Sequence, residues 1–154
     1  MNNKISNIDS SILDDLITGR VEPYIYAFST NTIPNYLKVG DTYRPVDTRI
    51  NEWKKLFPNL VKEFSAPARI DNNTIFRDYT VHSFLIDERG RERLLPSTYS
   101  NIVYYSKEFF KNATIKDLND AIIDIQKSAS ENSGKYQLYT TKRLPITFIY
   151  KSYW

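Results

Sequence analysis

Residues 24–40, "YIYAFSTNTIPNYLKVG", decide the fold that this sequence predicts. Two runs with strand-like alternation, residues 24–29 and 36–40, flank a loop whose proline and asparagines suit a turn. Alternation gives the expected hairpin two faces, and we expect one to be core and the second to have another role. The first face holds Ile25, Ala27, Leu37 and Val39, and the second holds Tyr24, Tyr26, Phe28, Tyr36 and Lys38.

A helix and a third strand are predicted directly after the hairpin. Pro45 suits a first helical turn, and Pro58 is expected to end the helix. Between them an apolar stripe recurs at helical spacing, formed by Val46, Ile50, Trp53 and Phe57, with Arg49 at its border. Residues 60–70 then supply a strand that stops near Pro67. The pattern indicates an α/β fold with a small, mainly antiparallel three-stranded sheet flanked by helices.

The later part of the chain is predicted to be mainly helical. Residues 75–85 form one helix, residues 106–110 begin a short helical piece, and Thr114 caps a third helix. The expected apolar anchors of that last helix are Leu118, Ile122, Ile123 and Ile125. We expect a loop over residues 87–105.

Length and composition predict one domain over residues 1–154, with a core at about 22–127. Residues 1–20 are expected to form an N-terminal helical arm, and residues 135–154 a strand-rich C-terminal extension. The chain has no cysteine, which excludes a disulfide framework or a thiolate site and fits the cytoplasm. No segment is apolar enough to predict a membrane span. The formal charge of +3 permits nucleic-acid binding without requiring it.

The only histidine, His82, follows Asp78 by four residues on one face of the expected helix over 75–85. One interpretation is a hydrogen-bonded pair at the edge of the core. The other is that this face lines a site, because a carboxylate removed from water needs a cation or hydrogen-bond donors beside it. The two residues alone leave both interpretations open.

Several short motifs, taken in order, resemble those of the GIY-YIG nuclease superfamily, in its branch with a KIG-like second motif. The motifs are "YIY" at 24–26, "KVG" at 38–40, Arg49, Asp78 with His82, and "EFF" at 108–110. Tyr24 replaces the usual first glycine, and Asp78 replaces the more usual glutamate. Lys38 in place of the second-motif tyrosine is itself a feature of that branch.

The resemblance implies metal-dependent DNA cleavage in restriction, repair or mobile-element defence. The candidate catalytic residues include Tyr24 and Tyr26 of the first motif. Tyr26 would be the general base beside Lys38, and Lys38 and Arg49 would contact the phosphate. Asp78 would bind Mg²⁺ (or Mn²⁺), and His82 would orient the phosphate or a water. The branch often occurs attached to restriction-type or helicase-like proteins, so further domains of a larger chain are expected as partners, besides DNA.

Each of these residues also has a purely structural interpretation. The tyrosines can pack on a half-buried face, and Arg49 can cover Trp53. Glu108 is expected to be a capping or dipole partner in the first turn of a helix, and Gly40 to permit close backbone approach behind the hairpin. Two other functions therefore stay open, a catalytically weakened DNA-binding module and a protein-interaction domain.

Overall fold

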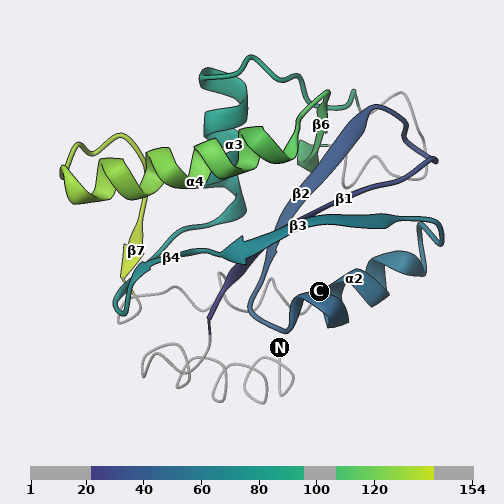
Figure 1. Ribbon diagram of the computed structural model, residues 1–154, viewed down its shortest axis with the longest axis horizontal. Helices are drawn as coiled ribbons and strands as arrows, with labels where there is room; N and C mark the ends of the chain where they lie inside the picture. The colour runs from purple at the N-terminus through teal and green to yellow at the C-terminus, as the bar shows by residue number, and fades with distance from the viewer. Residues whose placement is uncertain (1–21, 96–106, 141–154) are drawn as a thin grey trace, which may run out of the picture.

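The structure is a computed structural model that describes residues 22–95 and 107–140. The expected helical arm at 1–20 and most of the extension at 135–154 lie outside the described residues. The described elements are β1 (Tyr24–Ser29), β2 (Tyr36–Thr42), α2 (Val46–Lys54), β3 (Val61–Pro67), β4 (Arg69–Asp71), β5 (Thr74–Ile75), α3 (Asp78–Asp87), β6 (Phe109–Lys111), α4 (Ile115–Ser130) and β7 (Tyr139–Thr140). The α/β class is confirmed (Figure 1).

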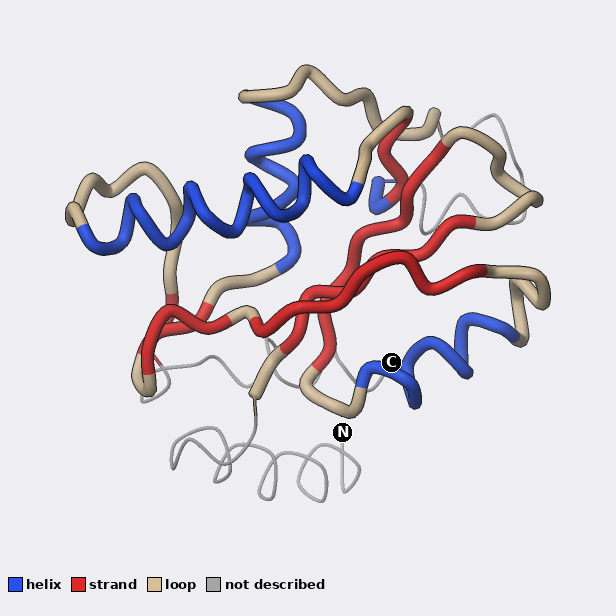
Figure 2. Tube along the Cα trace, in the orientation of Figure 1, coloured by secondary structure: helices blue, strands red, loops and turns tan. Residues whose placement is uncertain are grey.

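The main sheet is antiparallel and has four strands in the order β3-β1-β2-β6, one more than the sequence predicts. The extra strand is β6, where we expected a short helical piece; only a 3₁₀ turn at Lys107 and Glu108 precedes it. A strand fits because Phe109 and Phe110 enter cores on opposite sides of the sheet, which adjacent residues of a strand can do. A second small sheet has the order β4-β5-β7 (Figure 2).

Both faces of the hairpin are core, and helices cover the two sides of the sheet (Figure 1). Ile25, Ala27, Leu37 and Val39 pack with residues of α3 and α4, as predicted for the first face. The second face is also core: Tyr26 and Phe28 pack with α2 residues and Phe57. The aromatic side chains on this side fill the space under α2, so the expected division into one core face and one other face is wrong.

The helices begin and end close to the predicted residues, with corrections at the end of α2, the start of α3 and one expected anchor of α4. Pro45 is the N-cap of α2, and the helix ends at Lys54, before Pro58. Ile75 belongs to β5, and α3 begins only at Asp78. Thr114 caps α4 through a capping box with Asp117, as predicted. Ile123 is not an anchor, because 61% of it is exposed.

No helix within the described residues is both long and apolar enough to cross a membrane.

A candidate active site at the edge of the sheet

Tyr26 and Lys38 form a buried pair on the α2 side of the hairpin. Lys38 Nζ donates a hydrogen bond of 2.9 Å to the Tyr26 hydroxyl, and Trp53 Nε1 donates one of 2.7 Å to the same oxygen. Lys38 Nζ also lies 4.2 Å from the centre of the Trp53 ring, within range of a cation–π contact. Arg49 joins this group, and we call Tyr26, Lys38, Arg49 and Trp53 the Tyr26 cluster.

Gly40 makes room for this cluster. It lies across the hairpin from Tyr26, and a Cβ at Gly40 would be 2.4 Å from Lys38 Nζ and 2.7 Å from the Tyr26 oxygen. The sequence predicts a close backbone approach behind the hairpin at Gly40. The structure places the close approach at the two side chains instead, so glycine is required there by their contact.

Arg49 lies beside Tyr26 but is also held by its own helix. Its guanidinium donates a hydrogen bond of 2.9 Å to Glu52 and lies 5.0 Å from the centre of the Trp53 ring. Burial lowers the pKa of Arg49, but Tyr26 and the contact with Glu52 outweigh this and raise it. Arg49 is therefore a fixed positive charge, and its packing on Trp53 agrees with the structural interpretation as well as with the catalytic one.

Glu108 forms an ion pair with Lys38 and does not have the predicted capping or dipole role in the first turn of a helix. Its carboxylate lies 2.8 Å from Lys38 Nζ. Burial raises the pKa of Glu108, but the Lys38 ammonium outweighs it and lowers the pKa below its usual value. Burial also lowers the pKa of Lys38, and Glu108 and Tyr26 more than reverse this. The pair is therefore ionised, because each charge compensates the other.

Asp78 is the first residue of α3 and is held there by Asp41. The Asp78 backbone N–H donates a hydrogen bond of 3.0 Å to the Asp41 carboxylate, which also accepts one of 2.6 Å from Arg77 Nε. The Asp78 side chain is buried, and its carboxylate accepts no hydrogen bond from residues 22–95 or 107–140. Burial raises the pKa of Asp78 well above its usual value, and the nearby carboxylates of Asp41 and Glu108 add to this.

His82 forms a hydrogen bond with the edge of β2 just beyond the part that pairs with β6. The pairing of β6 with β2 ends at Lys38, and the next carbonyl, that of Val39, accepts a hydrogen bond of 2.8 Å from His82 Nε2. Because a carbonyl only accepts, Nε2 carries the proton, and Nδ1 is left with its lone pair in the neutral ring. Burial lowers the pKa of His82 to about 4, so the ring is neutral at pH 7. No hydrogen bond joins His82 to Asp78 in the described structure.

Asp78, His82 and Glu108 meet at one cavity of about 320 Å³, which we call the Asp78 pocket. Its other lining residues are Tyr79, Arg93 and Lys107. Glu108 is thus the link between the two groups, since it binds Lys38 of the Tyr26 cluster and faces the pocket. Tyr24 is not brought to either group: it begins β1 opposite Thr42 and Pro67, away from Lys38.

Sequence reasoning missed Arg93 and Lys107, which lie in or beside a predicted loop. Arg93 Nε donates a hydrogen bond of 2.9 Å to the Lys107 carbonyl, and the guanidinium lies 5.5 Å from the centre of the Phe110 ring. The run "RGRER" at 89–93 was the only signal for Arg93. A charge-rich loop does not reveal which of its arginines lines the pocket.

A divalent ion fits the Asp78 pocket in donor chemistry, although the described residues contain no ready group of three or more metal-ligating side chains. The Asp78 carboxylate is buried and accepts no hydrogen bond from the residues that the structure describes, and Glu108 and His82 line the same cavity. Carboxylate oxygens suit Mg²⁺, which keeps several waters and needs few protein ligands.

Comparison of the chain with protein-family models, curated proteins and solved structures finds no match.

Proposed function

We propose that this chain is a metal-dependent DNA endonuclease domain that hydrolyses phosphodiester bonds at the Asp78 pocket. The observation that carries the proposal is the convergence of four features around one cavity: the ionised Lys38–Glu108 pair, His82, Arg93, and an Asp78 carboxylate to which no described residue donates a hydrogen bond. Hydrolysis of a phosphodiester needs a proton acceptor, cations near the phosphoryl oxygens and a group that orients water. The pocket offers a candidate for each need.

Glu108 is the proton acceptor that we assign. Only 1% of Tyr26 is exposed, so the tyrosine reaches the pocket through Lys38 and Glu108 rather than directly. As the water oxygen bonds to phosphorus, one of its protons passes to the Glu108 carboxylate. The bond from phosphorus to the leaving oxygen breaks with its electron pair on that oxygen, which takes up a proton from solvent water. Tyr26 and Lys38 hold Glu108 ionised and in place, which corresponds to a preorganised site.

Asp78 is the residue that would bind Mg²⁺ or Mn²⁺, together with Glu108 or His82 Nδ1 at the same cavity. The ion would supply Lewis-acid polarisation of the phosphate. A positive charge there also compensates the carboxylates of Asp41, Asp78 and Glu108, whose mutual repulsion contributes to the raised pKa of Asp78. Arg93 and Arg49 provide the fixed positive charges of the protein itself.

A second candidate function is a DNA-binding module without catalysis, attached to a larger restriction-type or helicase-like protein. The observation in its favour is the raised pKa of Asp78, which favours a neutral carboxyl group when no cation is near. A neutral carboxyl group is a poor metal ligand. The arginines would then serve to bind the phosphate backbone only.

Asp78→Asn tests the proposal. We expect Mg²⁺-dependent nicking of supercoiled plasmid to be abolished, because the amide does not replace a carboxylate ligand. DNA binding in EDTA should stay within about threefold of the wild-type value, because the substitution removes no phosphate contact. The matched control is Asp47→Asn, since Asp47 is on α2 with 81% of its side chain exposed.

The two candidate functions give different results in the same assay. A wild-type protein that binds DNA but never nicks it with Mg²⁺ or Mn²⁺ supports the binding module. Asp78→Glu gives a further comparison, because the longer side chain restores the more usual residue of the resembled family. Retained nicking in Asp78→Asn, with a loss of about 1–3 kcal/mol in the free energy of unfolding, would show that Asp78 is structural.

A further inference from the structure

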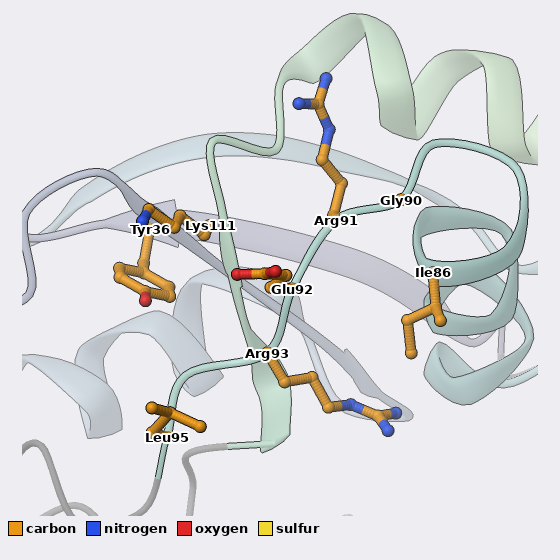
Figure 3. A pocket seen from close by; sticks show the side chains of 8 residues that line it. All are labelled: Tyr36, Ile86, Gly90, Arg91, Glu92, Arg93, Leu95 and Lys111. Carbon is orange, nitrogen blue, oxygen red and sulfur yellow. The ribbon is translucent and has the colours of Figure 1, made fainter.

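A second cavity adjoins the Asp78 pocket and has no part in the chemistry above. It has a volume of about 740 Å³ and lies beside the segment at 90–95, between β2, β6 and α3 (Figure 3). Arg93 lines both cavities, so they share one wall. A molecule whose phosphate lies in the Asp78 pocket can therefore continue past Arg93 into the larger cavity.

The charges of this cavity favour an anion. Lys111 is exposed, and neither it nor Arg93 forms an ion pair with any carboxylate in the part of the chain that the structure describes. Arg91 is different, because its Nε lies 2.9 Å from the Asp117 carboxylate. In Figure 3 the Arg91 side chain points toward α4, whereas the Arg93 side chain points away from it. Lys111 and Arg93 are thus the available cations.

An aromatic ring lies next to these cations. Tyr36 is paired with Lys111 across β2 and β6, so their side chains emerge on the same face of the sheet. The Tyr36 ring is half-buried and lines the cavity, as does Leu95, which is 67% exposed. A cation-lined groove with an aromatic ring is the arrangement that binds single nucleic-acid strands, since phosphates contact the cations and bases stack on the ring.

We infer that this cavity, the Tyr36 groove, binds an unpaired nucleic-acid segment that flanks the scissile phosphate. This inference rests on the proposed function, because the phosphate in the Asp78 pocket fixes where the segment begins. One phosphate lies against Lys111, and one base stacks on Tyr36. Glu92 also lines the groove and forms no ion pair within the described residues, so its carboxylate opposes a bound phosphate.

The test measures binding of fluorescein-labelled oligothymidylate to the 154-residue chain in EDTA, over a series of salt concentrations. Lys111→Ala should weaken binding and reduce the slope of log K against log salt by about 0.7, the value for one phosphate contact with a single strand. Lys62→Ala is the matched control, because Lys62 is on β3 at the opposite edge of the sheet. Its slope should equal that of the wild type.

Three further variants distinguish base stacking on Tyr36 and repulsion by Glu92 from a general effect of charge. Tyr36→Leu should weaken binding by about tenfold and Tyr36→Phe should not, because a base stacks on either aromatic ring. Glu92→Gln should strengthen binding. A blunt duplex of the same length should bind less tightly than the single strand, since its bases are already stacked. Melting temperatures of all variants show whether each remains folded.

The inference is overturned if Lys111→Ala keeps the wild-type slope, if Tyr36→Leu binds as Tyr36→Phe does, or if the wild type binds no oligothymidylate. Plasmid nicking distinguishes this failure from that of the proposed function. Absent nicking together with the expected binding changes leaves the Tyr36 groove intact and removes the nuclease proposal. Nicking by the wild type together with unchanged binding in both variants removes the groove alone.

Discussion

The Tyr26 cluster and the Asp78 pocket lie next to each other, but their polar groups are satisfied to very different extents. In the cluster, the Tyr26 oxygen accepts two hydrogen bonds, and Lys38 pairs with both Tyr26 and Glu108. In the pocket, the Asp78 carboxylate accepts no hydrogen bond from any described residue. Within the described residues, His82 forms a hydrogen bond through one ring nitrogen, to the Val39 carbonyl.

The difference indicates that the Tyr26 cluster holds charged groups in place, whereas the Asp78 pocket can bind a ligand. Buried polar groups are normally paired, and an unpaired carboxylate is costly to keep out of water. At Asp78 the charges of Arg77 and Lys38 offset only part of that cost. In the cluster, Lys38 and Arg49 each form an ion pair with a glutamate. We therefore expect substitutions of the buried residues of the cluster, Tyr26, Lys38 and Trp53, to affect stability and activity together, and substitutions in the pocket to affect activity with little loss of stability.

The largest effect is expected for Lys38→Met. It removes the cation from a pair in which only 1% of the lysine side chain and 22% of the Glu108 side chain are exposed. Breaking a buried pair leaves an uncompensated carboxylate, so the free energy of unfolding should fall by about 3 kcal/mol, with nicking lost. Urea denaturation measures the change, and Lys62→Met on β3 is the control.

The double variant Lys38→Met/Glu108→Gln examines whether the pair itself is responsible. Replacing the charge that Lys38→Met leaves behind should recover part of the lost stability, because the two substitutions act on one interaction. Nicking should stay absent, since the proposed proton acceptor is gone. Equal stability of the single and double variants would show that the ion pair contributes little and that the cluster is held by its aromatic packing alone.

Arg49→Ala should lower nicking by about 100-fold, the scale expected when one positioned donor is lost. Its melting curve should change little, because Arg49 lies at the surface of the cluster with 19% of its side chain exposed. Lys54→Ala removes an exposed charge from the same helix and serves as the control. Wild-type nicking by Arg49→Ala would leave Arg93 as the phosphate contact and reduce Arg49 to covering Trp53.

The cluster was largely predictable from the sequence, because its pattern is local. Alternation over residues 24–40 placed Tyr26 and Lys38 on one face, and the helical stripe that contains Trp53 placed Arg49 at its border. Strand and helix periods are properties of neighbouring residues, so these placements need no knowledge of the rest of the chain. The burial of that face was missed because the cover comes from a separate helix.

The pocket was predictable only in part, because its contacts join distant segments. Glu108 meets Lys38 across 70 residues of chain, and only after "EFF" forms a strand rather than a helix. Phe109 and Phe110 are adjacent and show neither the strand period nor the helix period. The sequence therefore could not show that they enter cores on opposite sides of the sheet. The hydrogen bond of His82 to Val39 exists because the β6 pairing stops one residue earlier, which is also a tertiary property.

Gly40→Ala should cost about 2 kcal/mol, the scale of overpacking a closely packed site. The added methyl carbon would lie 2.4 Å from Lys38 Nζ, so the ammonium or the Tyr26 ring must shift. Urea denaturation measures the loss, and Lys38→Met/Gly40→Ala should show less than additive loss because one clash is gone. Unchanged stability of Gly40→Ala would mean that the Tyr26 cluster is loosely packed, and its contrast with the Asp78 pocket would be weaker.

His82→Gln is expected to have the smallest effect, on the pH dependence of stability. Burial is the main cause that lowers the pKa of folded His82 to about 4; the charges of Arg93 and Lys38 add to it, whereas Val39 and Glu108 oppose it. The unfolded chain has the ordinary value of about 6.5, so between these two values the unfolded state binds the extra proton. This contribution to stability is present above pH 6.5 and is lost as the pH falls toward 4.

Between pH 7 and pH 5.5, His82 should account for a loss of about 1 kcal/mol in the free energy of unfolding. Glutamine can keep a hydrogen bond to the Val39 carbonyl through its amide N–H but does not titrate, so His82→Gln should lose about 1 kcal/mol less over this range. Urea denaturation of both proteins at the two pH values measures the difference. The same pH dependence in both would mean that the pKa of His82 is equal in the folded and unfolded protein, so that the ring is protonated in the folded protein at pH 5.5. His82 would then compensate the carboxylates of the Asp78 pocket, and the contrast with the Tyr26 cluster would disappear.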